Sequence, residues 1–564
     1  MESSNSVARQ KSSRGSAPVW RSVRVVLLFL VILWLALACT PLYAQGKSDV
    51  RRAAKLPSPE RIVGDYLKAV GGKKRLAAIR DATYSWTVML KEQELGEART
   101  QLKAPNAVRR DMIFGNGEIN AAANASSAWE RGLDGQLRTL VGTEASTARL
   151  RAMLEASRLV DYKKQSVLAR TVALDETTGE PAYLVEFSMR NGARLRYWFS
   201  AATKLLLKIS DDARKTSVRL MDYRVEAGVL EPHRMDLDVS GSGALTFRLT
   251  GARYNTGISE KVFDPPQSAG ALNVPALLRE VLRNQDAIDE RVSEYTFTQK
   301  ITERQIDERG ETKKETVRVY EVYPLPNRAP VFRLISEQGV LLSPERAAKE
   351  EKRVTEELVK AEQNREKDKL KREQEKQKRQ RERAERARKK GGDGSATAAE
   401  EGEDEELGIS QFLRACEFVS PRTERFRERD AVVFDFRPRA DFRPANREEE
   451  IISKLVGVVW IDPVDKQVMR LEARLSEGFK MGAGLLLKLS PGAAFVIEQT
   501  RMSDGVWLPR FAQINLSVRV LLFGGGSVNN TYEWSDYKRF NAETSGYKIG
   551  PPATDNPAEG KPNQ

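Results

Sequence analysis

The residue types that usually carry enzymatic chemistry are scarce in this chain of 564 residues. His233 is its only histidine, so a Ser-His-Asp triad, a histidine-rich metal site or an imidazole general base would each depend on one residue. Asp462 and Asp465 are a candidate pair of carboxylates, but Asp-Pro-Val-Asp is also typical of a turn between strands. The sequence therefore predicts no catalytic residue, no metal site and no cofactor.

Glycine-rich and cysteine motifs give no stronger signal. The apolar stretches 482–487 and 521–526 contain glycines but lack the spacing of a phosphate loop or a dinucleotide fingerprint. They are interpreted either as the flexible lip of an apolar cavity or as edge strands with glycine turns. Cys39 and Cys416 are the only cysteines, and because Cys39 lies in a segment expected to be removed, no intrachain disulfide is predicted.

A hairpin from Tyr183 to Phe199 supplies the clearest candidate binding face. A three-residue loop at 190–192, with Gly192 left-handed, pairs the apolar residues of the two strands and places them on one face. This face is interpreted either as ordinary core or as the lining of a lipid site, because an apolar space without fixed hydrogen bonds suits a flexible acyl chain. The lipid-binding candidates are Tyr183, Val185, Phe187, Leu195, Tyr197 and Phe199.

The N-terminus has the pattern of an export signal. A basic region is followed by a 14-residue apolar run, 25–38, which is shorter than the roughly 20 residues that span a bilayer. We expect cleavage after Ala44, so that 1–44 is a signal peptide and 45–57 a linker. Acylation of Cys39 and a retained membrane anchor are the alternatives. Each places the body of the protein in the periplasm or cell envelope.

Composition limits the remaining classes. The chain is 40% hydrophobic and 30% charged, which is too apolar for a disordered protein and too polar for a polytopic membrane protein. Its net charge of +14 comes from 93 Lys and Arg against 79 Asp and Glu. Part of that excess lies in local segments, so we do not expect nucleic-acid binding.

The two halves of the chain share an order of motifs. A helix starting at Ser58-Pro59 and ending at Gly71-Gly72, followed by a short helix and strands to about 263, is matched by a helix over 275–288 and a second run of strands. Trp198 and Lys204 match Trp460 and Lys466, and Gly228 to Pro232 matches Gly505 to Pro509. These shared features predict a tandem duplication, with domains at 58–268 and 272–542 and a disordered tail at 543–564.

This pattern resembles the outer-membrane lipoprotein-sorting family, which includes the LolA-type carriers. The resemblance lies in residues 62–72 (IVGDYLKAVGG), Tyr197-Trp198-Phe199-Ser200 through Lys204, and Asp222-Tyr223-Arg224 before Gly228 and Pro232. It implies an α+β fold of two tandem curved antiparallel half-barrels, each covered by helices, with acyl chains held between sheet and helices. The resemblance is weaker in the second copy.

A charged insert at 344–391 interrupts the second copy. Residues 345–390 hold 19 Lys and Arg against 12 Asp and Glu, with many acid-to-base pairs four residues apart. The pattern predicts a long, solvated single helix, followed by an acidic disordered loop at 392–407. Contact of the 345–390 helix with an anionic membrane surface is one possible role, and a solvated spacer is the other.

We therefore expect an exported, non-enzymatic protein whose partners are acyl chains or a lipidated protein. Two alternatives stay open at the sequence level. One is an envelope scaffold with fully packed sheets and a charged recruiting helix, and the other is a lipid-sensing envelope regulator. A cavity between a sheet and its helices would separate the lipid-binding hypotheses from the scaffold.

Overall fold

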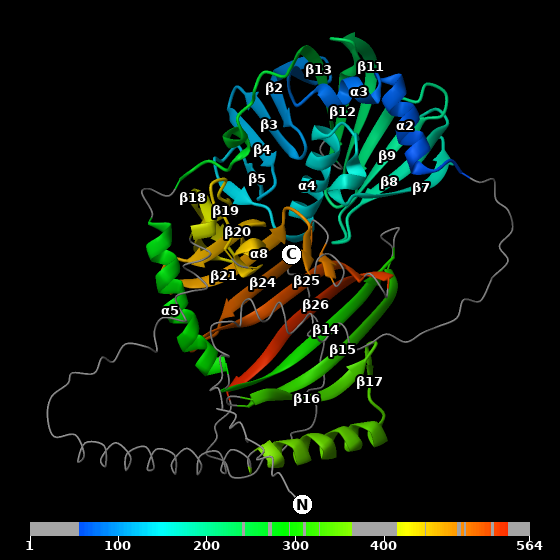
Figure 1. Cartoon of the computed structure of the whole chain (residues 1–564). Helices are drawn as coiled ribbons and strands as arrows, with labels where there is room; N and C mark the ends of the chain where they lie inside the picture. The colour runs from blue at the N-terminus through cyan, green and yellow to red at the C-terminus, as the bar shows by residue number, and fades with distance from the viewer. Residues whose placement is uncertain are drawn as a thin grey trace, which may run out of the picture.

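The computed structural model describes residues 56–239, 243–268, 273–292, 294–307, 312–325, 328–361, 363, 414–445, 447–481, 487–489, 492–520 and 524–539. Within these residues the chain forms two large antiparallel sheets and a few helices (Figure 1). The signal segment, the acidic loop, the C-terminal tail and residues 482–486 and 521–523 of the glycine-rich stretches lie outside the described residues. No helix in the described ranges is long and apolar enough to cross a membrane.

The first sheet has 13 strands and lies at the top of Figure 1. Its strands are β1 (Asp81–Leu90), β2 (Gln93–Lys103), β3 (Ala107–Phe114), β4 (Gly117–Ala123), β5 (Ala128–Arg131), β6 (Leu137–Thr139), β7 (Leu168–Asp175), β8 (Ala182–Ser188), β9 (Arg194–Ser200), β10 (Leu206–Asp211), β11 (Thr216–Glu226), β12 (Val229–Val239) and β13 (Gly243–Tyr254). Short 3-10 turns lie at Tyr162–Gln165 and Glu260–Phe263.

The second sheet also has 13 strands. They are β14 (Tyr295–Ile306), β15 (Thr312–Leu325), β16 (Arg328–Glu337), β17 (Val340–Leu341), β18 (Cys416–Phe426), β19 (Arg429–Pro438), β20 (Leu455–Asp462), β21 (Gln467–Leu475), β22 (Phe479–Met481), β23 (Leu487–Leu489), β24 (Ala494–Arg501), β25 (Trp507–Val520) and β26 (Gly524–Arg539). A short helix, α8 (Arg447–Ile452), precedes β20.

Both sheets are wound in the same way. In each, the first strand pairs with the last, β1 with β13 and β14 with β26. The chain runs outward from that first strand to one edge, at β6 or β17, crosses to the opposite edge at β7 or β18, and returns strand by strand. The crossover of the first sheet contains a helix, and the charged insert falls in the crossover of the second.

Motifs matched in the sequence lie at matching places in the two sheets. Trp198 is in β9 and Trp460 in β20, each the third strand from the edge where the returning strands begin. Lys204 and Lys466 both have a positive φ in the turn that follows. Pro232 and Pro509 lie in the strands next to β13 and β26. The prediction that the two halves are copies of one half-barrel would account for these matching positions, and it stays a prediction.

The hairpin of β8 and β9 has the predicted register. Phe187 pairs with Leu195, Val185 with Tyr197, and Tyr183 with Phe199. The Met189 amide donates to the Ala193 carbonyl at 2.9 Å, and this bond closes the loop 190–192. Gly192 has a φ of 92°, a conformation that glycine adopts without the steric cost of a Cβ. The expected bulged loop is confirmed.

The chain enters the first sheet through two short helices, α2 (Pro59–Ala69) and α3 (Lys73–Ala78). Ser58 caps α2 by accepting the Arg61 amide, and Pro59 takes the first helical position, where its missing N–H costs nothing. The buried face of α2 contains Ile62, Val63 and Leu67, which join the same apolar cluster as the hairpin. The helix, glycine pair and short second helix agree with the sequence prediction.

A helix that the sequence analysis missed, α4 (Gly142–Ala156), fills the crossover of the first sheet. Leu150 and Leu154 belong to one apolar cluster, whereas Ala145 and Ala152 belong to another. Because α4 is buried on more than one side, its sequence lacks the single apolar stripe that identifies a surface helix. Figure 1 shows it lying inside the curve of the first sheet.

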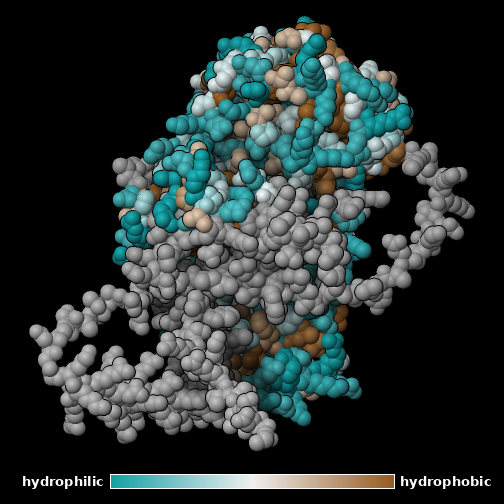
Figure 2. Space-filling view, in the orientation of Figure 1, coloured by the Kyte–Doolittle hydropathy of each residue, from teal (hydrophilic) through white to brown (hydrophobic). Residues whose placement is uncertain are grey.

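The second sheet is flanked by α5 (Val274–Val292). Val274, Leu277 and Val281 pack with Phe434, Phe436 and other apolar residues of β19 and β20. Hydrophobic side chains are thus gathered into separate clusters under each sheet, and the surface seen over the first sheet is mostly hydrophilic (Figure 2).

The beginning of the charged insert corrects the expectation of a fully solvated helix. Residues 344–361 are helical, but Val354 and Leu358 are 0% and 1% exposed and pack against Val331 of β16. Arg353 also donates to the Phe332 carbonyl. Val354 and Leu358 are four residues apart and share one helical face, so this apolar pair docks the first part of the insert on the sheet. Residues 364–391 lie outside the described residues.

Candidate functional site

A cavity of about 440 Å³ lies between the first sheet and α4. Strands from both arms of the sheet contribute to it, β1–β5 from one and β9–β12 from the other, together with β13 beside β1. The helices α2, α3 and α4 close it with Tyr66, Leu76 and Leu154. The strand order explains where the cavity lies. Because β1 pairs with β13, strands β1–β6 and strands β7–β13 form one sheet around the crossover helix α4.

Much of the cavity wall is apolar. Small side chains occur on β2 and β4, where alanines occupy inward positions that larger residues could have filled. The apolar lining includes Trp86, Ala98, Leu102, Val108, Met112, Ala121, Ala122, Ala123, Leu140, Met235 and Phe247. The apolar part of this wall favours hydrocarbon over water, since water would find few hydrogen-bond partners there, and charged residues of β3, α4 and β12 line the remainder.

A buried polar cluster stands at one end of the cavity. Glu231 Oε1 accepts hydrogen bonds from Tyr84 Oη at 2.8 Å, Tyr254 Oη at 2.9 Å and Arg158 Nη1 at 2.8 Å. The Arg158 guanidinium also lies over the Tyr254 ring, 5.3 Å from its centre. Arg158 and Glu231 are both 11% exposed in their side chains, so the pair is internally satisfied and holds the end of α4 on β12.

A second ion pair, Arg110 with Glu155, crosses from β3 to α4 within the cavity wall. Burial lowers the pKa of Arg110, although the neighbouring Glu155 carboxylate acts in the opposite direction. Burial raises the pKa of Tyr66, Tyr84 and Tyr223. The tyrosine hydroxyls around the cavity therefore stay neutral hydrogen-bond donors at physiological pH.

Two buried donors in the cavity wall lack hydrogen-bond partners among the described residues, Trp86 Nε1 and Tyr197 Oη. Trp86 is 5% exposed and Tyr197 is 2% exposed. A buried donor without a partner costs about 1–3 kcal/mol. A ligand oxygen placed near either donor would remove that cost.

The six residues predicted from the hairpin lie together in one apolar cluster. Val185, Phe187, Leu195, Tyr197 and Phe199 are at most 2% exposed, and Tyr183 packs on them while partly exposed. Tyr197 is the member that lines the cavity. The rings of Phe187 and Tyr197 meet edge to face at 5.0 Å, so the predicted face is continuous with the cavity wall through Tyr197.

The other sequence candidates are placed as follows. His233 lies in β12 with its Nε2 2.9 Å from Glu226 Oε1. Asp462 accepts the backbone amides of Val464 and Asp465 at 2.9 and 2.8 Å, which confirms the predicted turn. Cys416 is buried, and burial raises its pKa to about 12. In the described part of the chain, no group of three or more His, Cys, Asp or Glu residues could hold a metal ion.

Sequence reasoning missed most of the cavity wall, including Trp86, Ala98 and Arg158. One signal was available in the sequence: Tyr84 and Trp86 alternate with polar residues along β1, as in a half-buried strand. Ala98, Ala121 and Ala123 were a second signal, because small residues on the same face of β2 and β4, on either side of β3, leave space. What could not be read from the sequence is that α4 stands opposite them.

The two sheets are joined by a buried polar cluster. Arg422 of β18 has a fully buried side chain and donates to Glu424 at 2.7 Å, to Asp435 at 3.0 Å and to Thr139 Oγ1 of β6 at 2.6 Å. Ser127 donates to Asp435 Oδ2 at 2.5 Å. Thr139 and Ser127 belong to the first half of the chain, so these bonds fix its base against the second sheet.

No family model and no curated protein matches this chain. Solved structures similar to it include a DUF1329 family protein from Desulfovibrio piger, with 12% identity over 36% of this chain and 96% of the other and a TM-score of 0.26. A LolA superfamily protein from Nitrosomonas europaea has 11% identity over 37% and 99%, with a TM-score of 0.27.

A third similar structure is a putative outer membrane lipoprotein-sorting protein domain from Vibrio parahaemolyticus, with 13% identity over 36% of this chain and 94% of the other and a TM-score of 0.25. The resemblance to lipoprotein-sorting domains that the sequence predicts is thus found by structure comparison as well. At these TM-scores the similarities carry no conclusion about function.

Proposed function

We propose that this protein is an exported, non-enzymatic lipid-binding protein that holds an acyl chain, free or attached to a lipidated protein, in the cavity of its first sheet. In this proposal residues 58–268 and 272–542 are two half-barrel domains of one duplicated plan. The first domain carries the acyl-chain site.

The cavity is the observation that carries the proposal. A largely apolar, partly open cavity of about 440 Å³ can take up hydrocarbon, and each methylene that leaves water for such a space contributes about 0.8 kcal/mol. The scaffold alternative assumed fully packed sheets, so an unfilled space between the first sheet and α4 favours lipid binding. A lipid-sensing regulator would use the same cavity.

The ligand is expected to carry an oxygen near its acyl chain. Trp86 Nε1 and Tyr197 Oη are buried donors without partners among the described residues, and they belong to two residues that line the cavity. A carboxyl, ester or amide oxygen accepts a hydrogen bond from such donors. Fatty acids, glycerolipids and acylated peptides all meet this requirement.

Export to the cell envelope is proposed from residues 1–44, whose basic region and apolar run are typical of a signal peptide. An envelope location would bring the cavity close to its source of acyl chains. The 345–390 segment, which is net basic, would add attraction to an anionic membrane surface.

Native mass spectrometry of the protein purified from its own envelope tests this function. We expect a population heavier than the polypeptide by the mass of one lipid, and extraction should identify the same lipid. If the protein carries no lipid and also fails to bind added palmitate, the proposed function is wrong.

Two tyrosines of the β8–β9 hairpin provide a matched pair of variants. Tyr197→Phe removes the hydroxyl of a residue that lines the cavity, whereas Tyr183→Phe removes that of a residue outside it. A net hydrogen bond of about 0.5–1.5 kcal/mol predicts that lipid binds roughly 2- to 13-fold more weakly to the Tyr197 variant. Equal losses in both variants would place the lipid elsewhere.

A further inference from the structure

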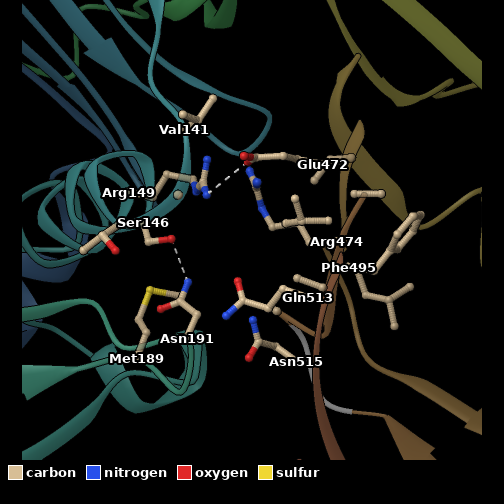
Figure 3. Close-up of a pocket in the computed structure, with 18 of the residues that line it drawn as sticks. Val141, Ser146, Arg149, Met189, Asn191, Glu472, Arg474, Phe495, Gln513 and Asn515 are labelled. Carbon is tan, nitrogen blue, oxygen red and sulfur yellow. Dashed lines mark hydrogen bonds and ion pairs between the residues drawn. The ribbon is translucent and has the colours of Figure 1, made fainter. Parts of the chain in front are cut away.

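A second and larger cavity, of about 1110 Å³, opens between the base of the first sheet and one face of the second sheet. We call it the cleft. One wall, on the left in Figure 3, contains the start of α4 and the hairpin loop with Met189 and Asn191. The other wall, on the right in Figure 3, is a polar face of β21, β24, β25 and β26 that includes Glu472, Arg474 and Gln513.

Positive charge predominates in the lining of the cleft, which contains seven Lys and Arg residues against four Glu residues. The buried glutamates are already engaged. Glu498 lies 2.6 Å from Arg470 and 2.6 Å from Arg427, and Glu472 lies 2.7 Å from Arg470. Closer to the rim, Lys300 is 2.9 Å from Glu533.

Arg474 is a cation of the cleft for which no ion pair is found within the described residues, although the carboxylates of Glu472 and Asp435 act on it from a greater distance. Its Nη2 is buried in the cleft and has no hydrogen-bond partner among the described residues. Burial, together with the positive charge of Arg149, holds the pKa of Arg474 well below its usual range, and the carboxylates of Glu472 and Asp435 offset only part of that effect. A buried charge without a partner is costly unless a ligand compensates it.

Arg149 faces Arg474 from the first sheet's side. Its guanidinium is 4.0 Å from Glu472, and its side chain is 10% exposed. Burial lowers the pKa of Arg149 too. Figure 3 shows Arg149 and Arg474 converging on one region of the cleft from opposite walls.

The N-terminus of α4 adds positive potential to the same region. Gly142 and Thr143 of its first turn line the cleft, and the N-cap residue, Val141, has no side-chain oxygen to accept their amides. The first amides of a 15-residue helix carry the positive end of its dipole and bind anions readily.

Neutral polar groups complete the wall. Asn515 is 9% exposed and its Oδ1 has no partner among the described residues. Since the two amide positions interchange by a simple flip, Asn515 can present Nδ2 to an anion. Asn191 is held by a 3.0 Å hydrogen bond to Ser146 Oγ.

We propose that the cleft binds a phosphate group, held between Arg149 and the first turn of α4 on one side and Arg474 with Asn515 on the other. A phosphate has enough acceptor oxygens to engage these donors from several directions, and guanidinium groups recognise it through paired hydrogen bonds. Because the donors come from α4 on one side and from the second sheet on the other, an occupied cleft stabilises the relative placement of the two halves. The phosphate belongs either to a lipid headgroup or to a free anion.

Titration of the full chain with inorganic phosphate and, separately, with dihexanoyl phosphatidic acid tests the site by calorimetry and thermal unfolding. Sodium chloride at matched ionic strength and dihexanoyl phosphatidylcholine are the controls. Binding of both phosphate probes identifies a free-anion site, and binding of phosphatidic acid alone identifies a headgroup site. No binding of either probe, or an equal effect of chloride, overturns the proposal.

Arg474→Met and Arg219→Met are the matched variants, because Arg219 is exposed on β11 and does not line the cleft. Arg474→Met should bind phosphate at least tenfold more weakly, and its ligand-free form should unfold at the same or a higher temperature, since an uncompensated buried charge has been removed. Arg219→Met should bind normally. A marked loss of thermal stability in ligand-free Arg474→Met would show that Arg474 has a structural role and would overturn the proposal.

Discussion

Filling the cavity of the first sheet should weaken lipid binding without unfolding the protein. Ala98 of β2 and Ala121 of β4 lie on the same face and both line the cavity. Leucine at either position adds three carbon atoms to the space that an acyl chain would occupy. At about 0.8 kcal/mol per displaced methylene, each substitution costs about 2.4 kcal/mol of binding free energy.

These values convert to large changes in affinity. A single variant should bind palmitate about 50-fold more weakly and the double variant Ala98→Leu/Ala121→Leu about 3000-fold more weakly. The ligand-free protein should unfold at an equal or higher temperature, because the added carbons enter an existing space rather than a packed core. Displacement of a fluorescent fatty acid by palmitate measures the affinity, and calorimetry measures the unfolding.

Ala244→Leu is the matched control, because Ala244 is exposed on β13 and does not line the cavity. It should bind palmitate like the unaltered protein. If the folded double variant keeps palmitate affinity within threefold of that protein, the acyl chain does not occupy this cavity and the reasoning is refuted. A fall in unfolding temperature for both single variants would show instead that the space is already packed.

Three further predictions concern stability and accessibility. Leu358→Ala should lower the unfolding free energy by about 2–5 kcal/mol in a urea titration. The control is Val359→Ala, at a neighbouring residue that is 47% exposed, and it should leave the unfolding free energy nearly unchanged. Equal effects would mean that the insert is not docked. Arg422→Met leaves Glu424 and Asp435 buried without their cation and should lower the unfolding free energy by about 3–5 kcal/mol. The control Arg425→Met, at an exposed residue, should hardly change it. A small decrease for Arg422→Met would contradict the buried cluster. Burial raises the pKa of Cys416 to about 12 in the folded protein, from a value near 9 in the unfolded chain, so the stability that its burial provides is complete below pH 9 and is lost as the pH rises from 9 to 12. Iodoacetamide at pH 9 should therefore label the thiol of the native protein far more slowly than that of the urea-unfolded protein. Equal rates would disprove the burial of Cys416.

Local features of the fold were predictable because they depend on neighbours in the chain. The register of the Tyr183–Phe199 hairpin follows from alternation and from the glycine at 192. The entry helix follows from Ser58-Pro59 at its start and Gly71-Gly72 after its end. The turn at Asp462 was likewise fixed by a side chain that bonds the amides two and three residues ahead.

Elements buried on several sides were harder to predict. Helix α4 was missed because Leu150 and Ala152 face different clusters and no single stripe marks the helix. The docking of the insert was missed because Val354 and Leu358 are two apolar residues in a long charged segment. In both cases the partner surface is formed by strands distant in sequence.

By itself, the sequence determined the antiparallel strands, the helices that open each half and the apolar face of one hairpin. It also predicts the export signal. These depend on periodicity, caps and turns, which act over a few residues. Only the tertiary structure decided which residues enclose space. The cavity wall joins Trp86 and Ala98 to Tyr197 because β1 pairs with β13 around α4, and the cleft sets Arg149 against Arg474 because the two sheets meet at Arg422. No local pattern encodes a meeting of residues separated by hundreds of positions.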